Sequence, residues 1–513
     1  MTETDAAEGA RSVIAGPDPA AGRAGPPAAR VPWRRWAALA VLLTGSFIYT
    51  LDFFVVNVAI PSLQRDLHAN AAAVQFVVAG YGVATAAGLI TGGRLGDLFG
   101  RRRMFFAGLV LFCLASAACG LAPTAAILVL ARVLQGLAAA LFAPQVLAIL
   151  GVVYQGRDRV TAFTAYGLSL GLAAVCGQLI GGLLIQADVA GSGWRAVFLV
   201  NVPVGAAALL LTPRLVPESR APGGRLDLVG VALVTAGLVA IVLPLVEGRQ
   251  QGWPAWTWAC LAASVPLLLA FAAWERRLSA AGGSPLIDLA LFRARAFTVG
   301  VLTALVFFAG MASFFLVLAI YLQQGRGLSA LASGVVFTAI GAGYFVTTLY
   351  AGRLAARFGP VALAVGALIL AIGAALVSVS VQRLGPAGHI AWLTPALLVD
   401  GAGMGLVLAP LNSTVLAGIA PRHAGTASGV LATVIQVGNA LGVAVIGIIF
   451  FGALGHGDGY SEAMRASLVY LIALAVAVAA LLLLLPRSRP GGPRREASRR
   501  EGADGRVGMV RTR

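Results

Sequence analysis

Apolar runs of roughly 20 residues follow one another along nearly the whole chain, and they constrain its fold more than any other feature. Each run can cross a ~30 Å hydrocarbon layer as a helix. A helix satisfies the hydrogen bonds of its own backbone, for which lipid offers no partners. The alternating ten-residue segments of a membrane β-barrel do not appear. We predict an all-α integral membrane protein with 14 transmembrane helices, which begin near residues 37, 73, 103, 124, 161, 196, 228, 255, 297, 332, 361, 391, 424 and 465.

The charge of the chain is explained by membrane topology. The net charge is +17, and all 37 basic residues are arginines. With the N-terminus in the cytoplasm, about 30 arginines fall in cytoplasmic segments and about 6 outside, as the positive-inside rule requires. We therefore expect a multi-pass protein of the cell inner membrane with both termini in the cytoplasm. We expect its arginines to bind anionic lipids, and we expect no nucleic-acid partner.

A short polar loop occurs once in each half of the chain. The segment GRLGDLFG at 93–100 returns as GRLAARFG at 352–359, identical at five of eight positions, and LFAP at 141–144 resembles VLAP at 407–410. Such duplication is typical of transporters with alternating access. The predicted divisions are a disordered cytoplasmic N-terminal tail (1–33), a first six-helix bundle (34–215), two extra helices (216–275), a polar cytoplasmic linker (276–296), a second six-helix bundle (297–486) and a disordered basic cytoplasmic tail (487–513).

Four motifs resemble those of one transporter family. The loop at 93–102 is similar to the signature loop between spans 2 and 3 of the major facilitator superfamily. Residues 51–61 and 132–136 resemble the first-span and fourth-span motifs of its drug:proton antiporters, and 194–205 resembles the sixth span of the 14-span branch. The resemblance implies two six-helix bundles with two extra central helices, and proton-coupled efflux of small lipophilic drugs or antibiotics. It implies no enzymatic activity and no cofactor besides the proton gradient.

Asp52 and Arg132 are the candidate proton-coupling residues. At 1.5 Å per residue, Asp52 lies ~22 Å from the cytoplasmic edge of its span and Arg132 ~12 Å from the outer edge of its own. In a ~30 Å core these depths differ by only ~4 Å. Burial disfavours a charged carboxylate and a nearby arginine favours it, so a movement that separates the two changes proton affinity. We interpret Asp52 as the proton carrier and Arg132 as its modulator; the alternative is a static ion pair.

The repeated loop is a candidate conformational latch. In the family this loop holds one conformation, and Asp97 is placed to meet a helix N-terminus or an arginine of its own loop. Ala356 replaces the acid in the second copy, so the latch is expected on one side only. The alternative is that the arginines only fix the topology. The residues of the predicted latch are Gly93, Asp97, Gly100, Arg101 and Arg102.

Glycines of the fifth span are expected to pack helices closely. Gly177, Gly181 and Gly182 resemble the antiporter motif of the exporters, and small residues allow helices to approach one another. Gln178 stands where the family usually has proline, so the sequence leaves a kink of this helix open.

A polyspecific cavity is expected to be mostly apolar with a few polar anchors. For each candidate anchor, a hydrogen bond between helices is the alternative. Asp400, the acid of the twelfth span, lies near the midplane, where it can attract a cationic drug, bind a second proton or hydrogen-bond a neighbouring helix. The candidates are Tyr81, Gln135, Gln145, Asp400, Asn412, Gln436 and Asn439.

Other activities find little support in the sequence. The chain has no GxxxxGK[ST] loop for ATP and no HExxH motif, and its four cysteines form no CxxC pair, so we expect no metal site. An uptake permease of the same superfamily remains an alternative. A non-transporting membrane receptor is less favoured, because no sizeable soluble domain is present. We expect a monomer.

Overall fold

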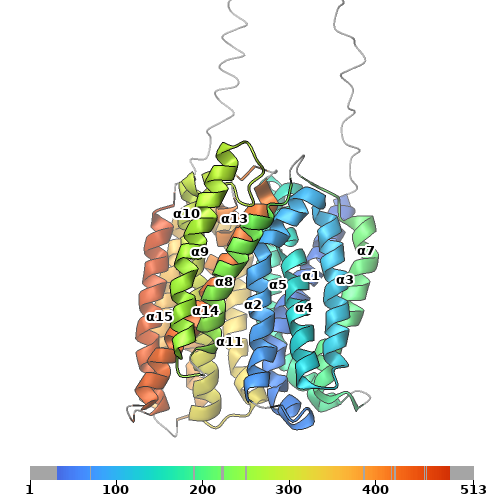
Figure 1. The fold of residues 1–513 in the computed structure, drawn as a ribbon. Coiled ribbons are helices and arrows are strands. Elements are labelled where there is room, and N and C mark those ends of the chain that lie inside the picture. Colours follow the sequence, from blue (N-terminus) through green and yellow to red (C-terminus); the bar gives the residue numbers. More distant parts are fainter. Residues whose placement is uncertain are drawn as a thin grey trace, which may run out of the picture.

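The computed structural model describes residues 32–485 except 70, 189–190, 221–224, 249–250, 385–387, 417–418, 421–422, 456 and 458. Within these residues the regular structure is entirely helical (Figure 1). The predicted tails lie outside the described residues, apart from the first turn of α1, which begins at Pro32. Both ends of the described chain lie at the upper end in Figure 1, which we call the tail side.

The prediction of 14 membrane helices is confirmed. Thirteen segments of the described residues are long and apolar enough to span a membrane, and α5 makes the fourteenth when its two parts, joined at a 47° bend, count as one span. The first bundle contains α1 (Pro32–Asp66), α2 (Ala71–Phe99), α3 (Arg101–Gly120), α4 (Ala125–Val153), α5 (Gly156–Ala187), η2 (Gly193–Arg195), α6 (Ala196–Leu199) and α7 (Asn201–Leu215), the last three forming one span.

The second half of the chain repeats this arrangement after two extra helices. The extra helices are α8 (Leu228–Glu247) and α9 (Ala255–Ala280). The second bundle contains η3 (Leu289–Arg293), α10 (Arg295–Ile320), η4 (Tyr321–Gly325), α11 (Ala330–Phe358), α12 (Pro360–Leu384), η5 (Ile390–Leu393), α13 (Thr394–Val415), α14 (Ala424–Gly455) and α15 (Tyr460–Leu483).

Local sequence explains where several helices begin. Thr124, Asp227 and Ser329 precede α4, α8 and α11, and each side chain accepts a hydrogen bond from a backbone N–H of the first turn. Such caps satisfy donors that a helix leaves unpaired. Gly100 joins α2 to α3 with φ of 107°, a conformation that glycine adopts without steric cost.

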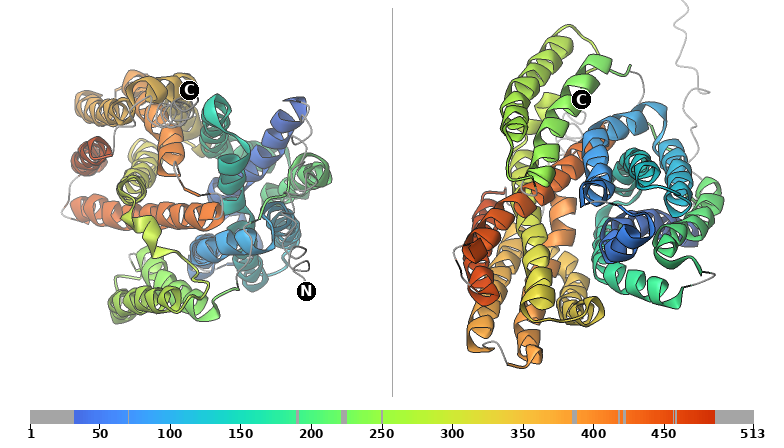
Figure 2. Two further views of the ribbon diagram at one scale, coloured as in Figure 1. Left: turned by 90° about the horizontal axis from the view of Figure 1, so that it is seen from above. Right: turned by 60° about the horizontal axis from the view of Figure 1, so that its bottom comes forward.

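The bundles lie side by side and meet along two pairs of helices (Figure 2). The helix α2 packs against α14, and α5 packs against α11. The extra helix α8 packs against both α2 and α14, while α9 packs mainly against α8. The two extra helices, central in the sequence, thus lie at the edge of the molecule over one of the two seams between the bundles.

The segment predicted as a polar linker, 276–296, is bounded by two long helices and is partly buried. The helix α9 continues to Ala280 and α10 already begins at Arg295. Between them Leu286 and Ile287 are buried, and the N–H of Ile287 donates to Oε2 of the buried Glu275 at 3.0 Å. Burial of these apolar side chains fixes the segment against the tail side of the helices.

The bend of α5 lies between Ala174 and Leu179, beside Gly177. Gly177 is buried, and a Cβ added there would lie 3.1 Å from Cβ of Phe54 on α1. The helix therefore bends next to a close helix contact, although the sequence offers no proline at this point. Gly181 is buried, and Gly182 is half-buried.

Candidate functional site

Asp52 of α1 and Arg132 of α4 form an ion pair inside the first bundle. Nη1 of Arg132 donates to Oδ2 of Asp52 at 2.5 Å. The side chain of Asp52 is 0% exposed and that of Arg132 is 1% exposed. The structure thus brings together the two residues that the depth argument placed in one layer. A charged pair this deeply buried needs further hydrogen bonds to offset its lost hydration.

Two amide side chains supply hydrogen bonds to Asp52, and a serine hydroxyl accepts from both amides. Its Oδ1 accepts from Nε2 of Gln135 at 2.9 Å and from Nδ2 of Asn201 at 2.8 Å. Both amides also donate to Oγ of Ser116, at 3.1 and 3.0 Å. We call Asp52, Ser116, Arg132, Gln135 and Asn201 the Asp52 cluster; all five are buried, and they come from α1, α3, α4 and α7.

Arg132 has partners that do not depend on Asp52. Its Nε donates to the carbonyl oxygen of Val77 on α2 at 3.0 Å, and its Nη1 also donates to Oε1 of Gln135 at 2.8 Å. The guanidinium carbon lies 4.3 Å from the centre of the Tyr81 ring, within the range of a cation–π interaction. Arg132 can therefore stay in place as a cation when the charge of Asp52 changes.

Sequence reasoning missed two members of the cluster, Ser116 and Asn201. Asn201 belongs to the stretch that resembles the family's sixth span, and each is an isolated polar side chain in an apolar run. That signal is weak, because single serines and asparagines often only join membrane helices. In the structure Asn201 donates directly to the carboxylate, and Ser116 accepts from the two amides that do so.

Asp97 links the two bundles on the tail side. Its Oδ1 accepts from Nη2 of Arg101 at 2.7 Å and from the N–H of Gly425 at 3.0 Å. Its Oδ2 accepts from the N–H and the hydroxyl of Thr426, at 2.9 and 3.1 Å. Gly425 and Thr426 open α14 of the second bundle, where an anion is favoured by the unpaired N–H groups. Both partner types considered for Asp97, a helix N-terminus and a loop arginine, are present.

The glycines of the predicted latch permit this close contact. A Cβ added at Gly93 would lie 2.3 Å from the carbonyl oxygen of Gly425, so α2 approaches α14 at a point that only glycine fits. At Gly100 the positive φ and the nearby carboxylate of Glu218 leave no room for a side chain. Glu218, which the sequence did not single out, also accepts from the N–H of Arg102 at 3.1 Å.

The remaining candidate anchors differ in their contacts, and their substrate role stays a prediction. Gln145 of α4 donates to the carbonyl oxygen of Gly92 at 2.7 Å. Nδ2 of Asn439 donates to Oε1 of Gln436 at 3.2 Å. Asn412 is buried, and neither its amide nitrogen nor its oxygen has a hydrogen-bond partner among the described residues.

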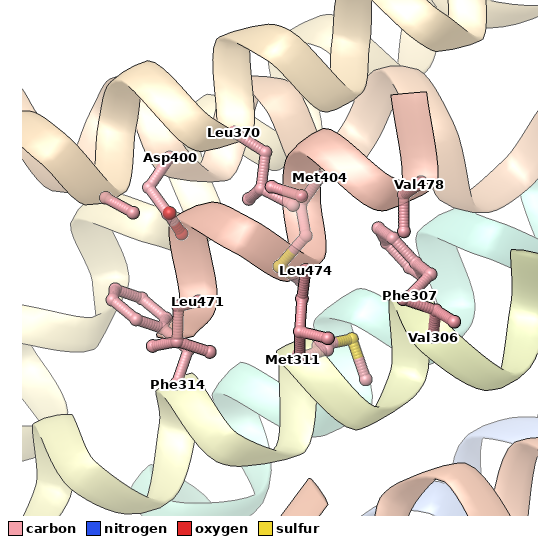
Figure 3. Close-up of a pocket in the computed structure, with 13 residues that line it drawn as sticks. Val306, Phe307, Met311, Phe314, Leu370, Asp400, Met404, Leu471, Leu474 and Val478 are labelled. Carbon is pink, nitrogen blue, oxygen red and sulfur yellow. The ribbon is translucent and has the colours of Figure 1, made fainter. Parts of the chain in front are cut away.

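Asp400 of α13 lies inside the second bundle, at a cavity of about 30 Å³ between α10, α12, α13 and α15. Figure 3 shows its carboxyl group directed into the space between Phe314, Leu370, Met404 and Leu471. No hydrogen bond satisfies its Oδ2 within the described residues. Whether this residue binds substrate stays a prediction, and its surroundings are considered further below.

In the described part of the chain, no group of three or more His, Cys, Asp or Glu side chains is placed to bind a metal ion. All four cysteines are free. What the Asp52 cluster offers is instead a buried acid whose cationic partner has further hydrogen-bond acceptors.

Comparison with known proteins gives consistent matches. Residues 42–443 match the sequence model of the Major Facilitator Superfamily. The chain is 41% identical to the probable actinorhodin transporter of Streptomyces coelicolor over 86% of this chain and 76% of that protein. It is 37% identical to the puromycin resistance protein pur8 of Streptomyces alboniger, over 88% and 90% of the two chains. It is 35% identical to the tetracenomycin C resistance and export protein of Streptomyces glaucescens, over 87% and 82%.

Solved structures of low sequence identity share the fold. The human organic anion transporter MFSD10 superposes with a TM-score of 0.62 at 18% identity, over 88% of this chain and all of that one. The proton:xylose symporter XylE superposes with the same TM-score at 15% identity, over 88% and 95%. On the sequence match and the shared fold, this chain belongs to the Major Facilitator Superfamily.

Proposed function

We propose that this protein exports small lipophilic antibiotics or drugs across the cell membrane in exchange for protons. The relatives named for probable transport of actinorhodin, for resistance to puromycin, and for resistance to and export of tetracenomycin C support the substrate class. The arginine distribution supports a cytoplasmic tail side. The energy source in this proposal is the proton gradient, and the transport cycle includes no enzymatic step.

The observation that carries the proposal is the buried ion pair of Asp52 and Arg132. In this mechanism Asp52 receives a proton from the outer side, which removes the charge that Nη1 of Arg132 contacts. Arg132 then keeps its bonds to the carbonyl oxygen of Val77 and to Gln135. The electrostatic attraction between α1 and α4 weakens, while Arg132 keeps its remaining hydrogen bonds. Proton binding is therefore coupled to the packing of the first bundle.

The conformation of this structure fits one half of the cycle. On the tail side, Asp97 joins α2 to α14, and the hydroxyl of Ser428 on α14 donates to the carbonyl oxygen of Pro144 on α4 at 2.8 Å. On the same side, Arg159 of α5 donates to the carbonyl oxygen of Leu416, just after α13, at 3.0 Å. In the proposed orientation these contacts close the cytoplasmic end, and opening it to load substrate requires the Asp97 contacts to break.

The test is transport by inverted membrane vesicles from cells that express the protein. We expect puromycin and tetracenomycin C to enter inverted vesicles when a proton gradient is imposed, and a protonophore to abolish the uptake. Asp52→Asn removes the titrating group and should abolish pH-driven uptake, whereas Asp52→Glu, which keeps a carboxyl group, should retain part of it. Flux of the opposite sign would identify an uptake permease, and unaltered pH-driven transport by Asp52→Asn would refute the coupling role.

A further inference from the structure

The cavity at Asp400 occupies the place in the second bundle that the Asp52 cluster occupies in the first. The two bundles are repeats, so α10, α12, α13 and α15 correspond to α1, α3, α4 and α7. The Asp52 cluster joins the latter four helices, and the Asp400 cavity lies among the former four. Each set of four corresponding helices thus encloses a buried carboxyl group, which belongs to α1 in the first bundle and to α13, the counterpart of α4, in the second.

The surroundings of the two acids differ in one respect. Asp52 faces a cation and two amides, whereas Asp400 is 2% exposed and its Oδ2 has no hydrogen-bond partner among the described residues. Every other residue around the cavity is apolar. The lining residues besides Asp400 are Val306, Phe307, Gly310, Met311, Phe314, Leu370, Ala374, Met404, Leu471, Leu474, Ala475 and Val478.

No charged group of the neighbouring helices faces Asp400 in the described residues. On α11, the hydroxyl of Tyr344 is directed to Gly167 of α5. The charged groups of these helices lie near helix ends. They are Arg295 at the start of α10, Arg353 and Arg357 in the last turns of α11, Arg383 at the end of α12, Glu462 and Arg465 paired in the first turns of α15, and Arg157, Asp158 and Arg159 in the first turn of α5, of which Arg159 donates to the carbonyl oxygen of Leu416.

The size of the cavity restricts what Asp400 can bind. A single water needs about 10–15 Å³ of such volume, so a cavity of about 30 Å³ holds one or two waters and no drug molecule. An unpaired carboxylate in so apolar a place is costly, and a bound proton removes that cost without needing more room. We propose, building on the proposed function, that Asp400 carries a second proton, and that two protons enter for each molecule exported.

The proton balance of this step is simple. A proton from the outer water forms an O–H bond on the Asp400 carboxylate, and that bond breaks on the cytoplasmic side to return the proton to water. Two protons moving in against one monovalent cation moving out carry one net charge inward. With Asp52 alone, the same exchange carries no net charge, and the membrane potential then contributes nothing.

The test uses the full-length protein in proteoliposomes with ethidium, a permanent monovalent cation, as the probe. A potassium gradient with valinomycin sets the potential, and the pH gradient is set independently. We expect the wild type to respond to both. Asp400→Asn should keep the response to pH and lose the response to potential, which at 100 mV removes about 50-fold in the accumulation ratio. Asp400→Glu should restore it, and Glu462→Gln, which removes an exposed acid of α15, should behave as the wild type.

Infrared spectra of the same proteins in lipid give a readout without substrate. We expect a protonated carboxyl band in the wild type and in Asp52→Asn that is missing in Asp400→Asn. An unchanged response to potential in Asp400→Asn, or an unchanged carboxyl band, overturns the second proton site. Loss of pH-driven transport in Asp52→Asn alongside these results leaves the proposed function intact, whereas ethidium transport by the wild type that ignores both gradients refutes the proposed function itself.

Discussion

Substitution of Asp97 by asparagine should open the tail side of the molecule. Three hydrogen bonds from Gly425 and Thr426 cross between the bundles to the buried Asp97 carboxylate. Bonds to a charged group contribute about 1.5–3 kcal/mol each. Asparagine keeps one acceptor oxygen but no charge, so at least one bond is lost and the other two weaken to about 1 kcal/mol each, and at the lower value the closed state loses about 2.5 kcal/mol. That is roughly a 10²-fold change in the ratio of closed to open molecules.

The opening can be measured as a distance between the bundles. Arg157 at the start of α5 and Phe358 at the end of α11 are exposed on the tail side. Spin labels on cysteines at these positions, in a protein whose native cysteines are replaced, report the separation by electron–electron double resonance. We expect one short distance in the otherwise unaltered protein and a longer second population in Asp97→Asn.

The matched control is Glu218→Gln. Glu218 also lies beside the loop but accepts from Arg102 and Ser219, both in the first half of the chain. Its substitution should therefore leave the distance distribution unchanged. The latch interpretation is wrong if Asp97→Asn keeps the short distance alone, or if Glu218→Gln opens the tail side as far as Asp97→Asn does.

Three further changes test other contacts. Asn201→Ala removes a 2.8 Å bond to Asp52 and should shift the pH profile of export, whereas a purely structural role would lower expression and leave the profile as it is. Arg132→Lys keeps the charge but cannot make all the hydrogen bonds of the guanidinium. Export should therefore fall at least tenfold, while the amount of the protein in the vesicles stays unchanged. Gly93→Ala places a Cβ 2.3 Å from the carbonyl oxygen of Gly425 and should favour the open state in the distance measurement; an unchanged distribution would contradict the close packing.

The sequence was sufficient for the helices and for the central ion pair. Apolar length alone locates the spans, because lipid leaves the backbone no other partner than itself. The pairing of Asp52 with Arg132 followed from counting residues along two antiparallel spans, since a rise of 1.5 Å per residue converts position into depth. No such count identifies Ser116, whose part in the site depends on how α3 is rotated about its axis.

Contacts between distant segments lay beyond what the sequence could predict. The partner of Asp97 is the first turn of α14, 328 residues later, and no local pattern connects the two. The segment read as a polar linker contains Leu286 and Ile287, whose burial depends on the tail-side surface that the other helices form. Local patterns predict which surface of an element is apolar, and tertiary packing decides what covers it.

The two seams between the bundles differ in what covers them. Along the first, Val242 and Leu245 of α8 pack with Ala86 of α2 and with Ala440 and Ala444 of α14 in one small apolar cluster. Neither extra helix, α8 or α9, packs along the other seam in the described residues, and Leu172 of α5 and Phe345 of α11 are exposed there. Acyl chains of the surrounding bilayer can therefore contact that second boundary directly. A lipophilic solute that diffuses within the membrane meets one boundary between the bundles that α8 covers and one that faces lipid.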